Sequence, residues 1–212
     1  MKPETRNDAS SAPIRAAVFD IGMVLLHFDF ARATRRLAPR CSAQPANMAS
    51  LVWESGLVDA YDRGQILCEA FAAEAIRRIG FTGTIEEFLD AWSDIFDPIP
   101  AMFDRVRRWK ARGLSIYLLS NTCEAHVRFF TDRWDIFREF DGAIYSCRVG
   151  SLKPEPSIYR ALFTGHEVDP TTAVFIDDRR ENVEAARALG LHTSEYRDEA
   201  TLISELTPLG LD

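Results

Sequence analysis

Short apolar segments alternate with helix-like segments through the second half of the chain, and this alternation constrains the fold more than any other feature. Each apolar segment has the length of a strand, and the segments between them place apolar residues at helical spacing. A first strand is predicted at residues 15–19, and four more follow at 114–119, 143–145, 173–176 and 191–195. The pattern predicts an α/β fold with a doubly wound, Rossmann-like parallel sheet of about five strands.

The predicted helices fall into two groups. One group lies between and after the later strands, at residues 101–111, 124–134, 156–163, 181–189 and 199–206. The other separates the first strand from the second, with apolar residues at helical spacing over 47–61, 66–79 and 85–96. We therefore expect a core domain of residues 14–28 and 98–212, an inserted helical subdomain at 29–97, and a disordered leader at 1–13.

The bulk properties argue against several classes of function. The 212 residues suffice for one domain with an inserted subdomain. A net charge of −7 argues against nucleic acid as the main partner, and no apolar stretch reaches the length of a membrane span. The four cysteines form no CxxC pair, and the polar N-terminus lacks the apolar segment of a secretory signal. We expect a cytoplasmic protein, monomeric or homodimeric, that acts on neither nucleic acid nor membranes.

Polar residues stand where the predicted strands end. In parallel sheets, ligands bind beyond the carboxyl ends of the strands. Those ends carry Asp20, Ser120 with Asn121, and Asp177 with Asp178, and the loop after the third strand carries Lys153. Three carboxylates, a hydroxyl, an amide and an ammonium are therefore expected at one rim of the sheet.

Each of these residues also has a purely structural interpretation. Asn121, with Glu124 three residues later, fits a helix capping box, and Asp178 with Glu181 fits the same device. Lys153 is compatible with an exposed loop cation. The functional interpretation is stronger for the set than for any single member, because the segments occur in order and each lies at a predicted strand end.

Four motifs resemble those of the haloacid dehalogenase-like hydrolases, a superfamily dominated by phosphatases that form an aspartyl-phosphate intermediate. The motifs are VFDIGMVLL, YLLSN, GSLKPEPSIY and VFIDDRREN, and the resemblance extends over residues 15–196. Within the superfamily, the chain is similar to the sugar-phosphate phosphatases typified by bacterial alpha-glucose-1-phosphate phosphatase. The resemblance implies a magnesium-dependent phosphatase that hydrolyses a small phosphorylated metabolite, a phosphate monoester, with a sugar phosphate as the expected substrate.

The resemblance also implies roles for residues at the rim of the sheet. Asp20 is the implied nucleophile. Asp20, Asp177, Asp178 and the backbone carbonyl of Gly22 are the implied ligands of Mg²⁺, which prefers oxygen ligands. Lys153 is implied to bridge Asp20 and the phosphate, and so to be catalytic and substrate-binding at once.

Two further segments are implied to bind the phosphate and to position the metal. Ser120 is implied to hydrogen-bond a phosphoryl oxygen, which makes it both catalytic and substrate-binding. Asn121 and the backbone amides at the start of the following helix are implied to assist it. Asn182 is implied to orient the acidic pair.

The helical insertion resembles the family's cap, which closes over the site and selects the substrate. Residues 61–64 lie at a predicted interhelical turn that could point into the cleft. Arg63 is the candidate for a contact with phosphate or sugar hydroxyls, and a solvated arginine at a turn is the alternative. Trp53 and Trp92 are expected in the core of the insertion rather than as platforms for a sugar.

The chain departs from the usual family pattern at Gly22, where a second Asp normally protonates the leaving group and then activates water. General acid–base catalysis contributes roughly 10²- to 10⁴-fold. Three explanations stay open: the enzyme prefers leaving groups that depart readily, another side chain replaces the acid, with His27 and Asp29 as candidates, or the protein is inert. We favour the first, because the sugar-phosphate phosphatases that the chain resembles also lack this Asp.

Two other functions stay open as alternatives to the phosphatase. A 2-haloacid dehalogenase on the same scaffold also lacks the second Asp, but it needs no metal and has no paired acid of the Asp177–Asp178 kind. A catalytically inert binding or regulatory protein would keep the fold, and Gly22 is the best support for it. The retained acidic residues and Lys153 argue against an inert protein, since a binder would not need them all.

Overall fold

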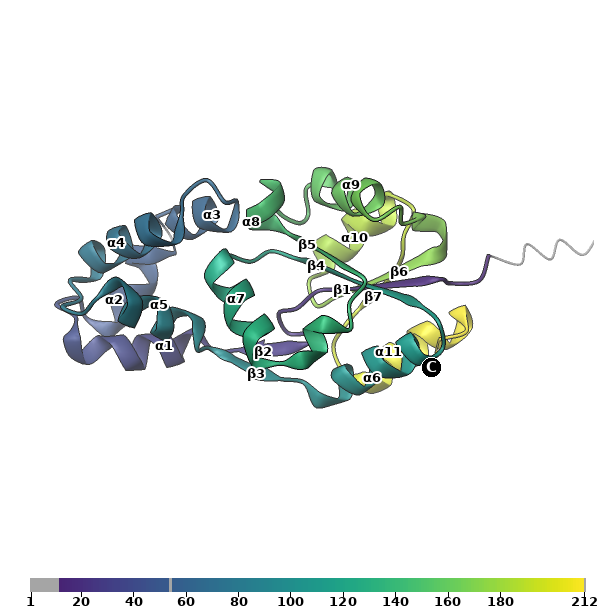
Figure 1. Cartoon of the computed structure of the whole chain (residues 1–212), viewed down its shortest axis with the longest axis horizontal. Coiled ribbons are helices and arrows are strands. Elements are labelled where there is room, and N and C mark those ends of the chain that lie inside the picture. The colour runs from purple at the N-terminus through teal and green to yellow at the C-terminus, as the bar shows by residue number, and fades with distance from the viewer. Residues whose placement is uncertain (1–11, 54, 212) are drawn as a thin grey trace, which may run out of the picture.

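A five-stranded parallel sheet forms the centre of the molecule (Figure 1). The computed structural model describes residues 12–53 and 55–211, so most of the predicted leader lies outside the described residues. In spatial order, the strands are β5 (Gly142–Tyr145), β4 (Ser115–Ser120), β1 (Ala16–Phe19), β6 (Ala173–Asp177) and β7 (His192–Glu195). The predicted α/β fold with five parallel strands is therefore confirmed, and each predicted strand lies within one or two residues of the observed one.

Helices cover both faces of this sheet. The helices that follow the insertion are α6 (Pro100–Ala111), α7 (Glu124–Arg133), α8 (Ser146–Val149), α9 (Pro156–Gly165), α10 (Arg180–Ala188) and α11 (Glu199–Leu206). Phe19 of β1 packs towards α6, where its ring centroid lies 5.6 Å from that of Trp109. Val18 belongs to the cluster on the opposite face, with Leu162 of α9. Because both faces are buried, the strands are apolar throughout rather than alternating with polar residues.

The helical insertion lies at the left of Figure 1. It packs around a hydrophobic cluster of its own. It consists of α1 (Phe30–Leu37), α2 (Pro45–Val52), α3 (Leu57–Asp62), α4 (Cys68–Ile79) and α5 (Ile85–Ser93). Two short antiparallel strands, β2 (Leu26–Phe28) and β3 (Phe96–Pro98), form the passage between insertion and core. We call α1–α5 the insertion; its exact domain boundaries, 29–97, stay a prediction.

Two expectations about the insertion were wrong, and three elements in or beside it were not predicted. The single helix expected at 47–61 is two helices, because Gly56 before α3 has φ +74°, which a right-handed helix does not contain. The helix expected at 85–96 ends at Ser93, and Phe96 instead begins β3. Helix α1 was not predicted, because its three arginines dilute the apolar periodicity, and β2 and β3 are too short to give a periodic signal.

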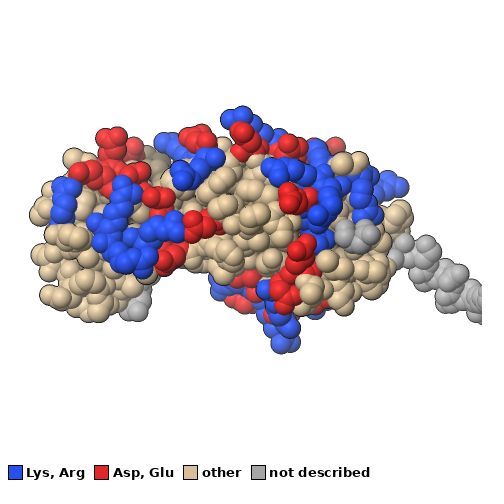
Figure 2. Space-filling view, turned by 90° about the horizontal axis from the view of Figure 1, so that it is seen from below, with Lys and Arg blue, Asp and Glu red and all other residues tan. Residues whose placement is uncertain are grey.

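Short 3₁₀ helices complete the described secondary structure, at Ala38–Arg40, Asp135–Arg138, Pro170–Thr172 and Thr207–Leu209. No helix among residues 12–53 and 55–211 is long and apolar enough to cross a membrane. Figure 2 shows one face of the molecule, on which basic and acidic side chains stand next to one another over the insertion. Helix α1 illustrates this, since its arginines pair with acidic side chains, Arg35 with Asp29 at 2.9 Å among them.

Candidate functional site

Three carboxylates meet at the carboxyl end of the sheet. The strand register explains why: Phe19 of β1 pairs with Ile176 of β6, so the next residues, Asp20 and Asp177, lie side by side. Ligand oxygens of Asp20, Asp177 and Asp178 all lie within 4.8 Å of one another. Asp20 is 7% exposed and Asp177 is fully buried. The structure thus brings together the three side chains predicted as metal ligands.

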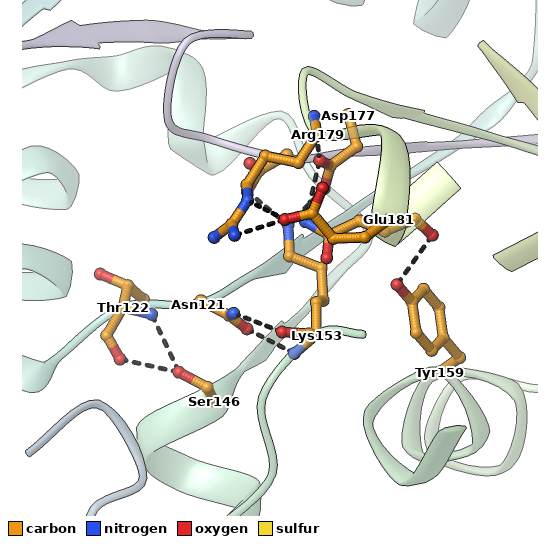
Figure 3. A network of polar contacts seen from close by, with 10 residues as sticks. Asn121, Thr122, Ser146, Lys153, Tyr159, Asp177, Arg179 and Glu181 are labelled. Atoms are coloured by element: carbon orange, nitrogen blue, oxygen red, sulfur yellow. Dashed lines mark hydrogen bonds and ion pairs between the residues drawn. The ribbon is translucent and has the colours of Figure 1, made fainter. Parts of the chain in front are cut away.

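Lys153 reaches this carboxylate cluster from the loop after α8 (Figure 3). Its Nζ lies 2.8 Å from Asp20 Oδ1 and 2.7 Å from Asp177 Oδ2. Burial by itself lowers the pKa of Lys153, but the attraction of the two carboxylates outweighs burial and the pKa is raised. Lys153 therefore stays a cation in the interior, and its interpretation as an exposed loop residue was wrong.

Asn121 holds the backbone of Lys153 in place. Its Nδ2 donates to the Lys153 carbonyl oxygen at 2.9 Å, and its Oδ1 accepts from the Lys153 N–H at 2.7 Å. The N-cap of α7 is instead Cys123, which makes no side-chain capping bond, so the capping-box interpretation of Asn121 was wrong. The predicted phosphate contact of Asn121 stays a prediction, and what the structure adds is that this side chain positions the lysine loop.

The Asp177 carboxylate is fixed by a dense set of hydrogen bonds. Asn182 Nδ2 donates to its Oδ1 at 2.9 Å and to its Oδ2 at 3.1 Å, and the Arg179 N–H donates to Oδ1 at 2.8 Å. The Tyr159 hydroxyl donates to the Asn182 carbonyl oxygen at 3.0 Å and anchors α10 (Figure 3). The N-cap of α10 is Arg179, so the expected capping box of Asp178 with Glu181 is also absent from this described helix.

Ser120 closes β4 beside the carboxylates. It is 3% exposed and lines the same cavity as Asp20 and Asn121. The chain beyond it is braced by Ser146, whose Oγ accepts from the Thr122 N–H at 2.9 Å. The hydroxyl of Ser120 therefore stands on a rigid part of the backbone, next to the acidic residues.

The electrostatics of the cluster favour a divalent cation. Burial raises the pKa of Asp20 to about 6, although Lys153 opposes this, and Asp177 adds to the rise. Burial and the neighbouring Asp177 also raise the pKa of Asp178. One ammonium thus faces three carboxyl groups, which leaves negative charge uncompensated in a poorly solvated place. A hard cation with oxygen ligands, such as Mg²⁺, fits this donor set.

Two adjoining cavities lie in front of the carboxylates. The smaller, of about 150 Å³, is lined by Asp20, Asp178 and Asn182. The larger, of about 290 Å³, extends under the insertion and is lined mainly by aromatic rings: Phe28, Phe30, Trp53, Trp92, Phe96, His126 and Phe130. The two cavities share Gly22, Phe28, Ser120, Asn121 and Arg179, so a ligand can occupy both at once.

The tryptophans and Arg63 differ in how they relate to these cavities. Trp53 and Trp92 belong to the core of the insertion as expected, and they also stack at 4.9 Å and line the larger cavity. Arg63 lines neither cavity. Its guanidinium pairs with Asp59 at 3.0 Å and with Glu155 of the core at 2.6 Å, so it joins the insertion to the core.

The two residues considered as substitutes for the missing acid also lie elsewhere. His27 is an exposed residue of β2, and Asp29 caps α1, where it accepts from the Ala31 N–H at 2.9 Å. Neither lines a cavity beside Asp20. The residues that sequence reasoning missed are Asp62 and Arg179, which both line the larger cavity; residues 61–64 were noticed as a turn, but nothing in the sequence singled out Asp62.

Comparisons with known proteins agree with this geometry. A model of the haloacid dehalogenase-like hydrolases matches residues 14–190. The chain is 24% identical over 205 residues to a D-ribitol-5-phosphate phosphatase from Bacteroides thetaiotaomicron, covering 92% of this chain and 97% of the relative. It is 25% identical over 201 residues to the sesquiterpene phosphatase astK from Aspergillus oryzae, covering 92% and 96%.

A solved structure gives the same result for the fold. A family enzyme from Bacteroides thetaiotaomicron, in complex with magnesium and inorganic phosphate, superposes with a TM-score of 0.79 at 22% identity, over 89% of this chain and 98% of that one. The family match spans β1, the insertion and the strands that carry Asp20, Ser120 and Asp177. The chain therefore belongs to the haloacid dehalogenase-like hydrolases and is a hydrolytic enzyme.

Proposed function

We propose that the protein is a magnesium-dependent phosphatase, which hydrolyses a small phosphate monoester through an aspartyl-phosphate on Asp20. The observation that carries the proposal is the contact of Asp20 with Lys153, next to the paired acids Asp177 and Asp178. The similarity to the ribitol phosphate and sesquiterpene phosphatases, and the magnesium and phosphate bound to the similar structure, support it. A sugar or sugar-alcohol phosphate is the first substrate class to test, in view of the ribitol phosphate relative.

Asp20, Asp177, Asp178 and the carbonyl of Gly22 would hold the Mg²⁺ ion. When bound, the ion supplies positive charge that reduces repulsion between the anionic ester and the nucleophile. Two unit charges at about 4 Å repel by about 4 kcal/mol at an effective dielectric of about 20. The residues at the site must therefore offset at least one such interaction, and Lys153 is placed to do so.

The chain's own residues then divide the work between them. The phosphoryl group occupies the smaller cavity, where Ser120 donates to one of its oxygens. Lys153, whose ammonium contacts Asp20 at the wall of this cavity, pairs with another oxygen. Asp20, whose pKa is about 6, is mostly a carboxylate at neutral pH and attacks phosphorus. The ester oxygen leaves towards the larger cavity, and water then cleaves the acyl phosphate to regenerate Asp20. In this proposal the insertion acts as the cap that encloses the leaving group.

The test is phosphate release from a panel of phosphate monoesters, with and without magnesium. Asp20→Asn serves as the matched blank, because the amide keeps the shape of the carboxylate but cannot attack. We expect magnesium-dependent release by the wild type and none by the variant. Metal-independent chloride release from a 2-haloacid, without phosphate release, would establish the dehalogenase alternative instead; neither activity would establish the inert one.

A further inference from the structure

Gly22 offers no side chain where the usual second carboxylate would stand, and the ring of Phe28 packs against this position. A Cβ placed on Gly22 would lie 3.0 Å from Cε1 of Phe28, so a larger residue there would have to displace the phenyl ring slightly. Phe28 lines both cavities from there. The site therefore lacks a proton donor on the β1 loop, and any donor for the leaving oxygen must come from another element.

Asp62 is a carboxyl group that the proposed mechanism has not yet used. It ends α3 and lines the larger cavity together with Gly22 and Ser120, which is where the leaving group of a bound ester would lie. Its side chain is half-buried. Within the described part of the chain, no hydrogen bond or ion pair engages its carboxyl group, in contrast to Asp59, which pairs with Arg63.

Contacts on both sides of Asp62 fix its position relative to the core. The Tyr61 hydroxyl accepts from the Ala125 N–H at 3.3 Å, and Arg63 pairs with Glu155 at 2.6 Å. Gly64, at φ +66°, lies so close to Cys147 that a Cβ on it would stand 2.0 Å from the Cys147 carbonyl oxygen. The end of α3 is thus held against the core, and Asp62 is held over the cavity.

The surroundings of Asp62 suit a group that both gives and takes a proton near neutral pH. Burial, with a smaller contribution from the nearby charge of Asp59, raises the pKa of Asp62 to about 7. The other titratable or charged groups that face it are Cys123, Cys147, His126 and Arg179. A general acid is most effective when its pKa lies near the working pH.

We propose that Asp62 is the general acid and base of this enzyme, supplied by the insertion in place of a carboxylate at position 22. The inference rests on the proposed phosphatase function. In the first step, Asp20 bonds to phosphorus, the bond from phosphorus to the ester oxygen breaks, and the Asp62 proton passes to that oxygen to release the alcohol. In the second step, water bonds to phosphorus, its proton passes to the Asp62 carboxylate, and the acyl phosphate breaks to Asp20 and inorganic phosphate.

The test compares Asp62→Asn with Asp90→Asn, a control in the insertion whose carboxylate is exposed, pairs with Arg36 and lines neither cavity. With an alkyl phosphate, whose leaving oxygen needs a proton, Asp62→Asn should lower kcat/KM by about 10²- to 10⁴-fold. With p-nitrophenyl phosphate, whose leaving group needs none, the first step should be little changed. Hydrolysis of the acyl phosphate should now be slow, giving a burst of p-nitrophenolate and a phosphoenzyme visible by intact mass.

A second readout is the pH profile. Wild-type kcat/KM with the alkyl ester should fall as the pH rises above about 7, because Asp62 then loses its proton, and this limb should vanish in Asp62→Asn. Asp62→Glu should restore part of the alkyl-ester activity and the limb, which guards against a variant that fails to fold. Equal losses with both esters and no burst would overturn the role of Asp62, whereas a wild type that hydrolyses no ester would overturn the phosphatase function itself.

Discussion

The ammonium of Lys153 lies 2.8 Å from the Asp20 carboxylate, and both side chains are almost fully buried. A second carboxylate, that of Asp177, lies 2.7 Å from the same ammonium. Lys153 therefore serves the fold and the reaction at once, because without it the buried carboxylates of Asp20 and Asp177 would lose the cation that both of them contact.

Replacing Lys153 by Met should abolish phosphate release and destabilise the protein. Removal of one partner of a buried ion pair costs about 3–5 kcal/mol in unfolding free energy. The control is Lys110→Met, since Lys110 pairs with Asp141 on the surface and its side chain is 34% exposed; such pairs contribute up to about 1 kcal/mol. Urea unfolding without magnesium measures both, and equal costs for the two variants would contradict the prediction.

Magnesium should raise the thermal stability of the protein, by an amount that grows with the logarithm of its concentration above the dissociation constant. A ligand at 100 times its dissociation constant stabilises the folded state by about 2.7 kcal/mol. Asp178→Asn should weaken this stabilisation, whereas Asp169→Asn, at an exposed 3₁₀ cap away from the site, should leave it intact. Scanning calorimetry over a magnesium titration checks the prediction without any substrate. A stabilisation that is the same in both variants would show that the ion binds elsewhere.

Gly64→Ala should destabilise the contact between α3 and the core. Gly113→Ala is the matched control, because its φ of +88° demands the same unusual backbone, but a Cβ there meets nothing within 4 Å. The control should lose about 1 kcal/mol from backbone strain alone. Gly64→Ala should lose more, since the Cys147 backbone must also move, and should lower alkyl-ester turnover. Unfolding free energies that agree within error would refute the predicted clash.

His126 should contribute a loss of stability in mild acid, against the opposite contribution of Asp20 and Asp62, whose raised pKa values favour the folded state as the pH falls. The His126 Nε2 donates to the Trp92 carbonyl oxygen at 3.1 Å, and burial lowers the pKa of His126 from 6.5 to about 4. The unfolded chain therefore takes up a proton before the folded one does, and this contribution is lost as the pH falls from 6.5 to 4. The full loss is about 3 kcal/mol. Relative to the wild type, His126→Gln should gain about 3 kcal/mol of stability between pH 6.5 and 4, measured by urea unfolding across that range. A pH dependence identical to that of the wild type would count against His126.

The sheet and its acidic rim could be predicted because both depend on neighbours in the sequence. An apolar strand followed by Asp20, or by Asp177, carries its own signal, and the parallel register then sets the two residues side by side. The burial of Lys153 and the use of the Asn121 side chain could not be predicted. Both depend on the loop that carries Lys153 folding back onto Asn121 at the end of β4, and these two residues are 32 positions apart in the sequence.

The position of Asp62 beside the larger cavity could not be predicted from the sequence. Its role depends on how the insertion packs on the core, which is decided by side chains as distant as Glu155, 92 residues after Arg63. The break at Gly56 also turned what looked like one continuous helix into two, and only the second of these ends at Asp62. A helical pattern in the sequence predicts which face of a helix is buried. It does not predict the angle between that helix and the next one.

The anchoring of α3 by Tyr61, Arg63 and Gly64 has a consequence for the timing of the reaction. If the proton donor travels with the insertion, it is present only while the insertion rests on the core. Ester cleavage would then begin only after the substrate is enclosed. A molecule whose insertion has moved away from the core would lack the proton donor and would not cleave the ester. Weakening these contacts would slow the chemical step itself. The same few contacts would therefore control both the enclosure of the substrate and the rate of its cleavage.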